Sequence, residues 1–262
     1  LPKDNSTQVY WEMQPWLELL QSGAFSADTL SRLPISYQTT DRWLKVLQKS
    51  AEFQGMTWLH ALHLGIALTE RGDIDEPRTL FAKSMALKPN PLAARNLAVL
   101  CSTQEDAWVF YKQAWSLLHK DFSHDVNAYE RLSHNLITEI SFFLQQNSWY
   151  DEMSWFIQEV ASRPALMNVE IDAFITMTIK DMMHNAKYDE ALQELSSHCF
   201  PTYAKARSDL MSMWQSAVEG KAAQQAGHAL SAVDRHRARM STPIPDNIGC
   251  QYASEYCLNY WQ

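Results

Sequence analysis

Glycine is scarce in this sequence, with 7 in 262 residues, and no long apolar run is present. Few glycines favour packed helices, because glycine destabilises a helix whereas the leucine, methionine and alanine that are frequent here do not. A membrane span needs about 18 or more apolar residues in a row, so we expect no membrane contact. No secretory signal is visible. The chain starts without methionine, which leaves open that it is a fragment of a larger protein.

Recognisable catalytic motifs are also missing. The sequence contains no glycine-rich nucleotide loop, no G-x-S-x-G elbow and no H-E-x-x-H pair. We therefore predict that the chain is not an enzyme and binds no cofactor and no metal. One alternative is a metal held by His60 and His63, which are three residues apart, although the favoured explanation is a half-exposed histidine pair on a helix. The other is a reactive Cys199 beside His198, although neighbours along a helix point in different directions.

The four cysteines form no C-x-x-C pair. They are Cys101, Cys199, Cys250 and Cys257. Isolated cysteines are typical of free thiols in a reducing compartment, so we predict a cytoplasmic protein. A disulfide between Cys250 and Cys257, which are close in the sequence, remains the alternative.

The formal charge of −8 is unevenly distributed along the chain. Residues 200–262 carry six Lys/Arg against five Asp/Glu, so the remainder carries the whole excess of negative charge. An acidic surface repels phosphate groups, which argues against nucleic acid as a partner. Within 235–239 three arginines stand close together. Cations are favoured near the end of a helix, although the same cluster suits the docking of an acidic segment, such as one from a second copy.

Apolar residues recur at helical spacing through most of the chain, and no strand-like alternation is sustained. The clearest case is 57–71, where Trp58, Leu62 and Ile66 define one face. We expect Asp73 or Asp75 to cap the following helix. Helices are expected over 9–21, 27–33, 41 to Gly55, 57–71, 75–87, 92–100, around 107–114, 127–146, 150–162, 169–184, 187–197, 201–219 and 221–240, with Gly220 separating the last two.

The segment Gly65–Pro89 carries the spacing of a tetratricopeptide (TPR) unit, a helix–turn–helix of 34 residues. Such units stack into solenoids that bind partners. We predict an all-α fold, an α-solenoid of TPR-like helix–turn–helix repeats, some of them degenerate. Three parts are expected: a degenerate N-terminal helical segment (1–56), TPR-like repeats (57–200), and C-terminal helices with a capping tail (201–262).

A narrower resemblance rests on the stretch KSMALKPNPLAARNLAVL within 63–118. It resembles the C-terminal TPR tail of large bacterial TPR proteins in which a β-sandwich domain of unknown function precedes the tail. The resemblance covers about residues 57–248, and its most specific element is Arg95–Ala98. The β-sandwich domain is absent from this chain, so the resemblance implies neither a sugar-linked activity nor a catalytic residue.

Four residues are the predicted partner-binding site. Arg95 and Asn96 lie on the first helix of a pair, the kind that lines the concave face of a TPR array, and Trp58 and Trp108 are candidate aromatic anchors. Structural roles are the alternatives: an Arg–acid pair, a hydrogen bond between helices, and tryptophans wedged into the core. The predicted function is a non-enzymatic TPR-type scaffold that binds a protein or peptide in its groove. The alternative is a helical accessory region packed on a carbohydrate-related β domain of the same full-length protein.

Overall fold

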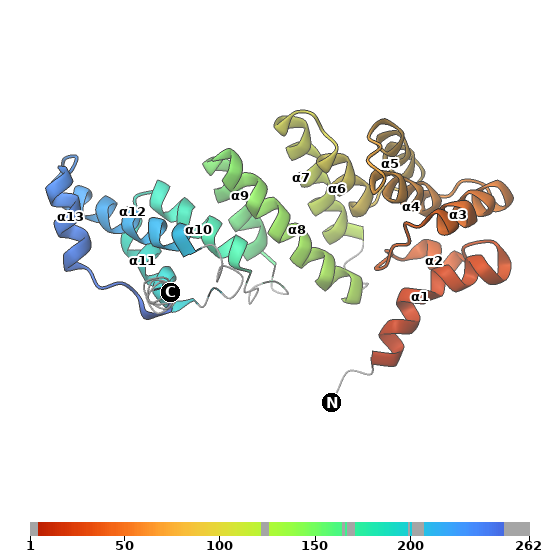
Figure 1. Ribbon diagram of the computed structural model, residues 1–262, viewed down its shortest axis with the longest axis horizontal. Helices are drawn as coiled ribbons and strands as arrows, with labels where there is room; N and C mark the ends of the chain where they lie inside the picture. The colour runs from red at the N-terminus through yellow and green to blue at the C-terminus, as the bar shows by residue number, and fades with distance from the viewer. Residues whose placement is uncertain are drawn as a thin grey trace, which may run out of the picture. The chain divides into compact units, whose positions relative to one another are not determined.

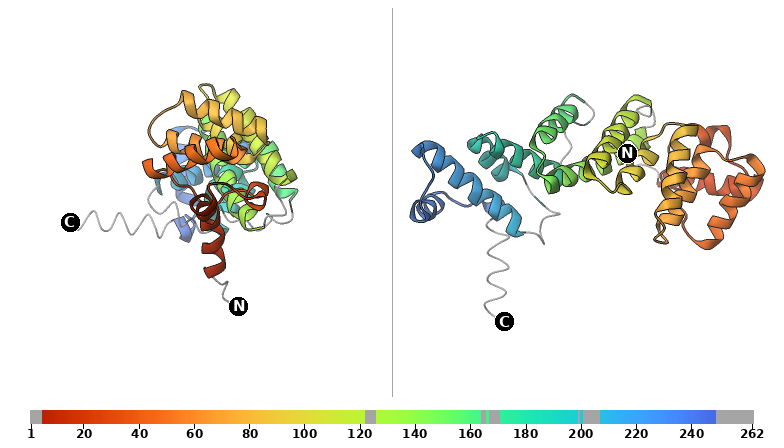
Figure 2. Two further views of the ribbon diagram at one scale, coloured as in Figure 1. Left: turned by 90° about the vertical axis from the view of Figure 1, so that its right-hand side faces the viewer. Right: turned by 90° about the horizontal axis from the view of Figure 1, so that it is seen from above.

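The computed structural model describes residues 5–121, 126–163, 166, 171–198, 200 and 207–248. These residues are helical with short connections, and no strand occurs among them. Successive helices pack in neighbouring pairs (Figures 1 and 2). The predicted all-α helical-repeat fold is therefore confirmed. None of the described helices combines the length and the apolar character needed to cross a bilayer.

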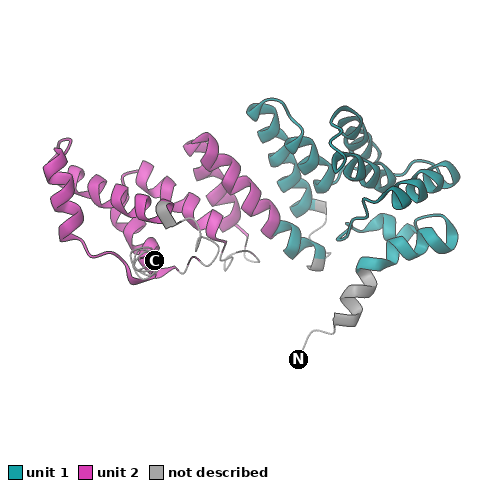
Figure 3. Cartoon of the chain, viewed as in Figure 1, with its two compact units in different colours: residues 1–133 teal, residues 134–262 magenta. Residues whose placement is uncertain are grey.

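Two compact units make up the chain, residues 1–133 and 134–262 (Figure 3). The helices that begin in unit 1 are α1 (Asn5–Ser22), α2 (Ala27–Ser31), α3 (Asp41–Gln54), α4 (Trp58–Thr69), α5 (Asp75–Leu87), α6 (Pro91–Val99), α7 (Gln104–Asp121) and α8 (Val126–Asn147), whose second half belongs to unit 2. Unit 2 continues with α9 (Tyr150–Ala161), α10 (Asp172–His184), α11 (Tyr188–Ser197), α12 (Arg207–Ala226) and α13 (Ala232–Ser241). The predicted three-part division, 1–56, 57–200 and 201–262, stays a prediction beside this two-unit division.

In unit 1 helix α4 packs on α5, and nine of the twelve residues of α4 are buried. Gly65 lies at the contact, where a Cβ atom would come within 2.6 Å of Cε1 of the buried Phe81. The absence of a side chain at Gly65 thus lets the two helices approach closely. Gly72 adopts φ +86° in the turn, a conformation that glycine alone adopts without strain. Pro89 follows the end of α5 and prevents the helix from continuing.

Buried hydrogen bonds fix the passage from α5 to α6. The Ser84 hydroxyl donates to the Trp58 carbonyl at 2.8 Å, and the Asn90 amide donates to the Ser84 Oγ at 3.1 Å. The Asn90 Oδ1 accepts from the Ala93 N–H at 2.9 Å and so caps α6. The predicted cap of α5 is wrong: Ile74 occupies the cap position without a side-chain hydrogen bond. Asp75 is instead the first helical residue, where its charge complements the helix dipole.

In unit 2 a cluster of buried apolar side chains joins α10, α11 and α12. Its members include Ile179, Leu195, Phe200, Leu210, Trp214, Ala217, Val218 and Ile248. The predicted break at Gly220 is wrong, because α12 continues through this residue to Ala226. A Cβ at residue 220 would lie 2.2 Å from Cε1 of Tyr188, so Gly220 serves a close approach between α11 and α12. The chain turns instead at Gly227, with φ +71°, and α13 packs on α12 (Figure 1).

Candidate functional site

The predicted site residues Arg95 and Asn96 are half-buried neighbours on α6. The Arg95 Nη1 donates to the Asn96 Oδ1 at 2.8 Å, and Arg95 has further interactions. The structure thus brings these two side chains together. Their role in binding a partner stays a prediction.

The two candidate tryptophans lie in the interior of unit 1. Trp58 is 5% exposed and Trp108 is 4% exposed. The Trp58 Nε1 donates to the Leu30 carbonyl at 3.1 Å, and the Lys88 ammonium lies 5.0 Å from the Trp58 ring centroid. The Lys112 ammonium similarly lies 5.3 Å from the ring centroid of Trp108. Both tryptophans are thus core residues, and each has a lysine ammonium near its indole ring. Their role in partner binding stays a prediction.

His60 and His63 are completely buried in unit 1, so the expectation of a half-exposed pair is wrong. The His60 ring is held between the hydroxyls of Ser50 and Thr57, each 2.8 Å from a ring nitrogen. His63 instead contacts aromatic rings, with the Trp16 centroid at 4.6 Å, and neither of its ring nitrogens has a hydrogen-bond partner.

Burial lowers the pKa values of both histidines. The pKa of His60 falls to about 4 through burial, and that of His63 to about 3 through burial and then the charge of His60. Both imidazoles are therefore neutral near pH 7. No group of three or more His, Cys, Asp or Glu side chains suited to a metal occurs within the described ranges. The predicted absence of a bound metal stays a prediction.

The structure describes only some of the residues named for thiol chemistry. Cys199 lies outside the described residues, as do Cys250 and Cys257. His198 places its Nε2 3.4 Å from the Oδ1 of Asp172 and packs against the Phe200 ring. Cys101 carries a free thiol whose pKa is raised chiefly by burial. Within the described part of the chain, these contacts provide no positive indication of catalysis.

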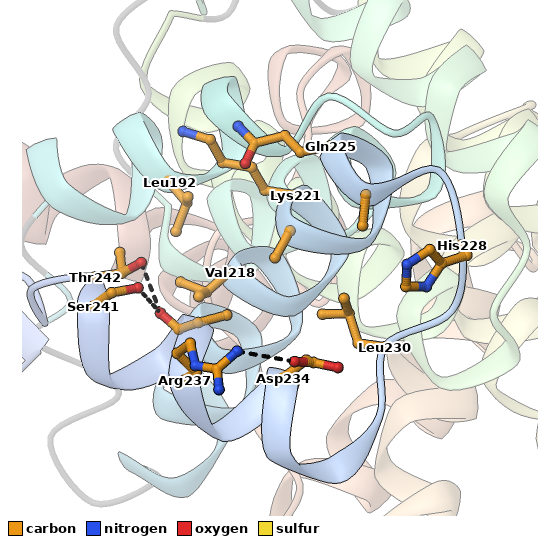
Figure 4. A pocket seen from close by; sticks show the side chains of 13 residues that line it. Leu192, Val218, Lys221, Gln225, His228, Leu230, Asp234, Arg237, Ser241 and Thr242 are labelled. Carbon is orange, nitrogen blue, oxygen red and sulfur yellow. Dashed lines mark hydrogen bonds and ion pairs between the residues drawn. The ribbon is translucent and has the colours of Figure 1, made fainter.

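A pocket of about 430 Å³ opens between α11, α12 and α13 of unit 2 (Figure 4). Leu192, Val218 and Leu230 give it an apolar floor. The remaining lining residues are Lys221, Ala222, Gln225, Ala226, His228, Asp234, Arg237, Ala238, Ser241 and Thr242. Figure 4 shows Lys221 and Gln225 of α12 on one side and Arg237 and Asp234 of α13 on the other. The pocket therefore combines an apolar base with charged groups on its rim.

Ion pairs within unit 2 set the charge of this rim. Lys221 pairs with Asp189 of α11. The Arg237 Nη1 lies 3.2 Å from Asp234 Oδ1, while the other oxygen of Asp234 accepts from the Ser231 hydroxyl at 2.6 Å. The Ser231 hydrogen bond is the largest influence that lowers the pKa of Asp234. Each of the two basic side chains, Lys221 and Arg237, is thus balanced by a carboxylate, and these four groups add no net charge to the opening.

Sequence reasoning identified only part of this pocket. The cluster 235–239 was recognised as a basic helix end, and it includes the lining residue Arg237. Val218, Lys221 and Gln225 were missed because the supposed break at Gly220 separated them. Their spacing of three to four residues places them on one face of a continuous helix. That periodicity is the signal that would have found them.

The comparisons with known proteins give one finding for this region. The family model described as "Transcriptional regulator, SIX1, N-terminal SD domain" matches residues 132–246, somewhat less than half of the chain. This segment is similar to that domain and nearly coincides with the described part of unit 2. No curated protein matches the chain, and no solved structure does.

The family match overturns several predictions. It does not support the resemblance to a bacterial TPR tail. It also contradicts both predicted functions, the TPR-type scaffold with a peptide groove and the accessory region of a carbohydrate-related protein. The exclusion of nucleic acid as a partner is likewise wrong for a chain that resembles a transcriptional regulator.

The physical reason for these errors is the nature of the motif. Gly65, Gly72 and Pro89 do what any close helix hairpin requires: a tight contact, a turn and a stop. Their spacing therefore recovered the fold class without identifying the family.

Proposed function

We propose that this chain is part of a transcriptional regulator and that unit 2 is its regulatory module. The observation that carries the proposal is the agreement of boundaries. The family match starts at residue 132 and unit 2 at residue 134, and the match extends past α13 to residue 246. The similarity thus extends over a whole folded unit rather than a short motif, which favours a shared role.

The surface chemistry of α13 supports a role in contacting other molecules. No residue of this helix is buried, and its exposed side chains include Arg235, His236 and Arg237. Val233 and Met240 are also exposed, at 65% and 74%. Arginines on an open helix face can bind phosphates or carboxylates. Unit 2 as a whole carries nine Lys/Arg and fifteen Asp/Glu, so we assign contacts with DNA to this basic face alone.

The proposal assigns unit 2 a non-catalytic role. It also requires the protein to work where the DNA is. In a cell without a nucleus, DNA lies in the cytoplasm, which is the compartment predicted from the isolated cysteines. In a nucleated cell, the proposal places the protein in the nucleus. Fractionation of the source cells distinguishes the two.

The test is a reporter assay with the whole chain fused to an unrelated DNA-binding domain. We expect the fusion to raise or lower transcription at least about twofold relative to that domain alone. Replacing both Arg235 and Arg237 by Glu should reduce the effect, and replacing Lys45 and Lys49 of α3 by Glu is the matched control in unit 1. A fusion that leaves transcription unchanged, together with absence of the native protein from chromatin, would refute the proposal.

Arg95, Asn96, Trp58 and Trp108 remain proposed contact residues within this function. Arg95 and Asn96 are the better test, because both tryptophans are in the core and their loss would disturb folding. The double change Arg95→Ala and Asn96→Ala should weaken the reporter effect while the helix content stays unchanged. If full reporter activity persists in this folded variant, unit 1 contributes no contact through α6.

A further inference from the structure

We propose that the pocket between α11, α12 and α13 binds a small amphipathic carboxylate, a molecule with one acid group and an apolar body. This inference goes beyond the proposed function. It is tested by binding to the purified protein, which does not depend on any effect on transcription. The pocket volume of about 430 Å³ lies within the range of about 300–1,000 Å³ that is usual for small-molecule sites. Six of its thirteen lining residues are apolar and seven are polar or charged, a mixture that suits a ligand with one apolar and one polar end.

The apolar floor selects the body of the ligand. Val218 is 3% exposed and belongs to the core cluster of unit 2, and Leu192 packs against that cluster. Leu230 is half-buried in the connection between α12 and α13. These side chains come from three different segments (Figure 4). An alkyl chain or a ring that covers them removes apolar surface from water, which favours binding roughly in proportion to the area covered.

Arg237 is the group that selects the acid. Its side chain is 74% exposed, and Asp234 occupies its Nη1. A guanidinium has five N–H donors, so donors remain for a carboxylate, which arginine binds in a two-pronged geometry. Lys221, on the opposite side of the opening, is 36% exposed in its side chain but is paired with Asp189, so Arg237 is the principal group for the acid. The apolar floor and Arg237 thus complement the two ends of an amphipathic acid.

Asp234 limits the charge of the ligand. Its carboxylate lies on the same rim as Arg237 and is fixed by the Ser231 hydroxyl. Asp189 and Asp234 balance the charges of Lys221 and Arg237, so a second negative charge on the ligand gains no net attraction and costs additional desolvation. The local charge therefore points to a monocarboxylate.

The experiment is an NMR titration of the full chain with decanoate. We expect saturable shifts of the amide signals of Ala222, Gln225 and Ala238, which line the pocket. Acetate lacks the apolar body and 1-decanol lacks the charge, so each should bind at least about tenfold more weakly if both ends of the ligand contribute. Decyl phosphate should also bind more weakly than decanoate. The absence of saturable shifts with decanoate, or equal affinity for decanol, would overturn the proposal.

Matched variants locate the site. Arg237→Gln should weaken decanoate binding about tenfold, the loss expected for one charge-assisted contact. Arg235→Gln is the control, because this arginine is exposed on the same helix but does not line the pocket. Ala222→Leu should block binding, because the larger side chain of this lining residue fills the pocket while leucine remains a good helix former. If Arg235→Gln weakens binding as much as Arg237→Gln, or if Ala222→Leu folds and still binds, the pocket is not the site.

Discussion

Helices α4 and α13 represent opposite extremes of this chain. In α4, nine of twelve residues are buried, including both histidines and Gly65. In α13, which is nearly as long, no residue is buried. The first helix contributes to the interior of unit 1, whereas the second covers one side of α12 and exposes arginines and large apolar side chains. The contrast separates a helix that is mostly interior from a helix that exposes candidate binding chemistry.

The largest expected difference is in the loss of stability when a buried or an exposed side chain is truncated. Phe81→Ala should destabilise unit 1 by about 3–5 kcal/mol, because a ring that is 1% exposed leaves a cavity. Met240→Ala should change stability by less than about 0.5 kcal/mol, since Met240 is 74% exposed. Denaturant titration with hydrogen exchange read separately in the two units measures both. Equal losses would show that exposure does not divide the chain in this way.

The two close-contact glycines sharpen the comparison. Gly65→Ala should cost about 1–3 kcal/mol, because the new Cβ meets a fully buried Phe81 ring that cannot move away. At Gly220→Ala the new Cβ meets Tyr188, which is only half-buried, and alanine regains about 1 kcal/mol of helix propensity. We expect a clearly smaller loss there by the same denaturant titration. A larger loss at residue 220 would contradict this view of α12.

Acid should destabilise unit 1 before unit 2. The folded-state pKa of His63 is about 3, below the ordinary value of 6.5, so the unfolded chain binds the proton more tightly. The contribution of this group to the free energy of unfolding is complete above pH 6.5 and decreases as the pH falls towards 3. The loss reaches about 2 kcal/mol at pH 5. His60, with a pKa of about 4, acts in the same direction.

A matched pair of variants tests the origin of this pH dependence. His63→Leu should reduce it and preserve or raise stability at pH 7, since both ring nitrogens of His63 lack partners. His236→Leu on the exposed face of α13 is the control and should leave the pH profile of unit 1 unchanged. Hydrogen exchange measured between pH 7 and 5 provides the profile. An unaltered slope in His63→Leu would assign the acid sensitivity elsewhere.

The smallest expected difference concerns helix caps. Asn90→Ala removes a buried cap of α6 and the partner of Ser84, at a cost of about 1–2 kcal/mol. Ser231→Ala removes the exposed cap of α13, at a cost of about 0.5–1 kcal/mol. Thermal unfolding of both variants gives the ranking. A costlier Ser231→Ala would mean that α13 is held by its cap more than by its packing on α12.

Most of the helices could be predicted from sequence because their signals are local. The starts and stops at Ser26, Gly55, Gly72 and Pro89 agree with the structure to within a few residues. The same glycine signal failed at residue 220, where the residue serves contact with Tyr188 rather than a turn. A glycine inside a helical pattern does not reveal which of these roles it has. The candidate pocket was missed for the same reason.

The sequence alone determined the all-α class and the approximate helix bounds, because helix period and capping act over a few residues. Tertiary structure alone decided that His63 is buried among rings and that Leu192, Val218 and Leu230 share a pocket floor. Burial depends on which distant segments pack together, and that is decided by the surface area that whole helices can remove from water.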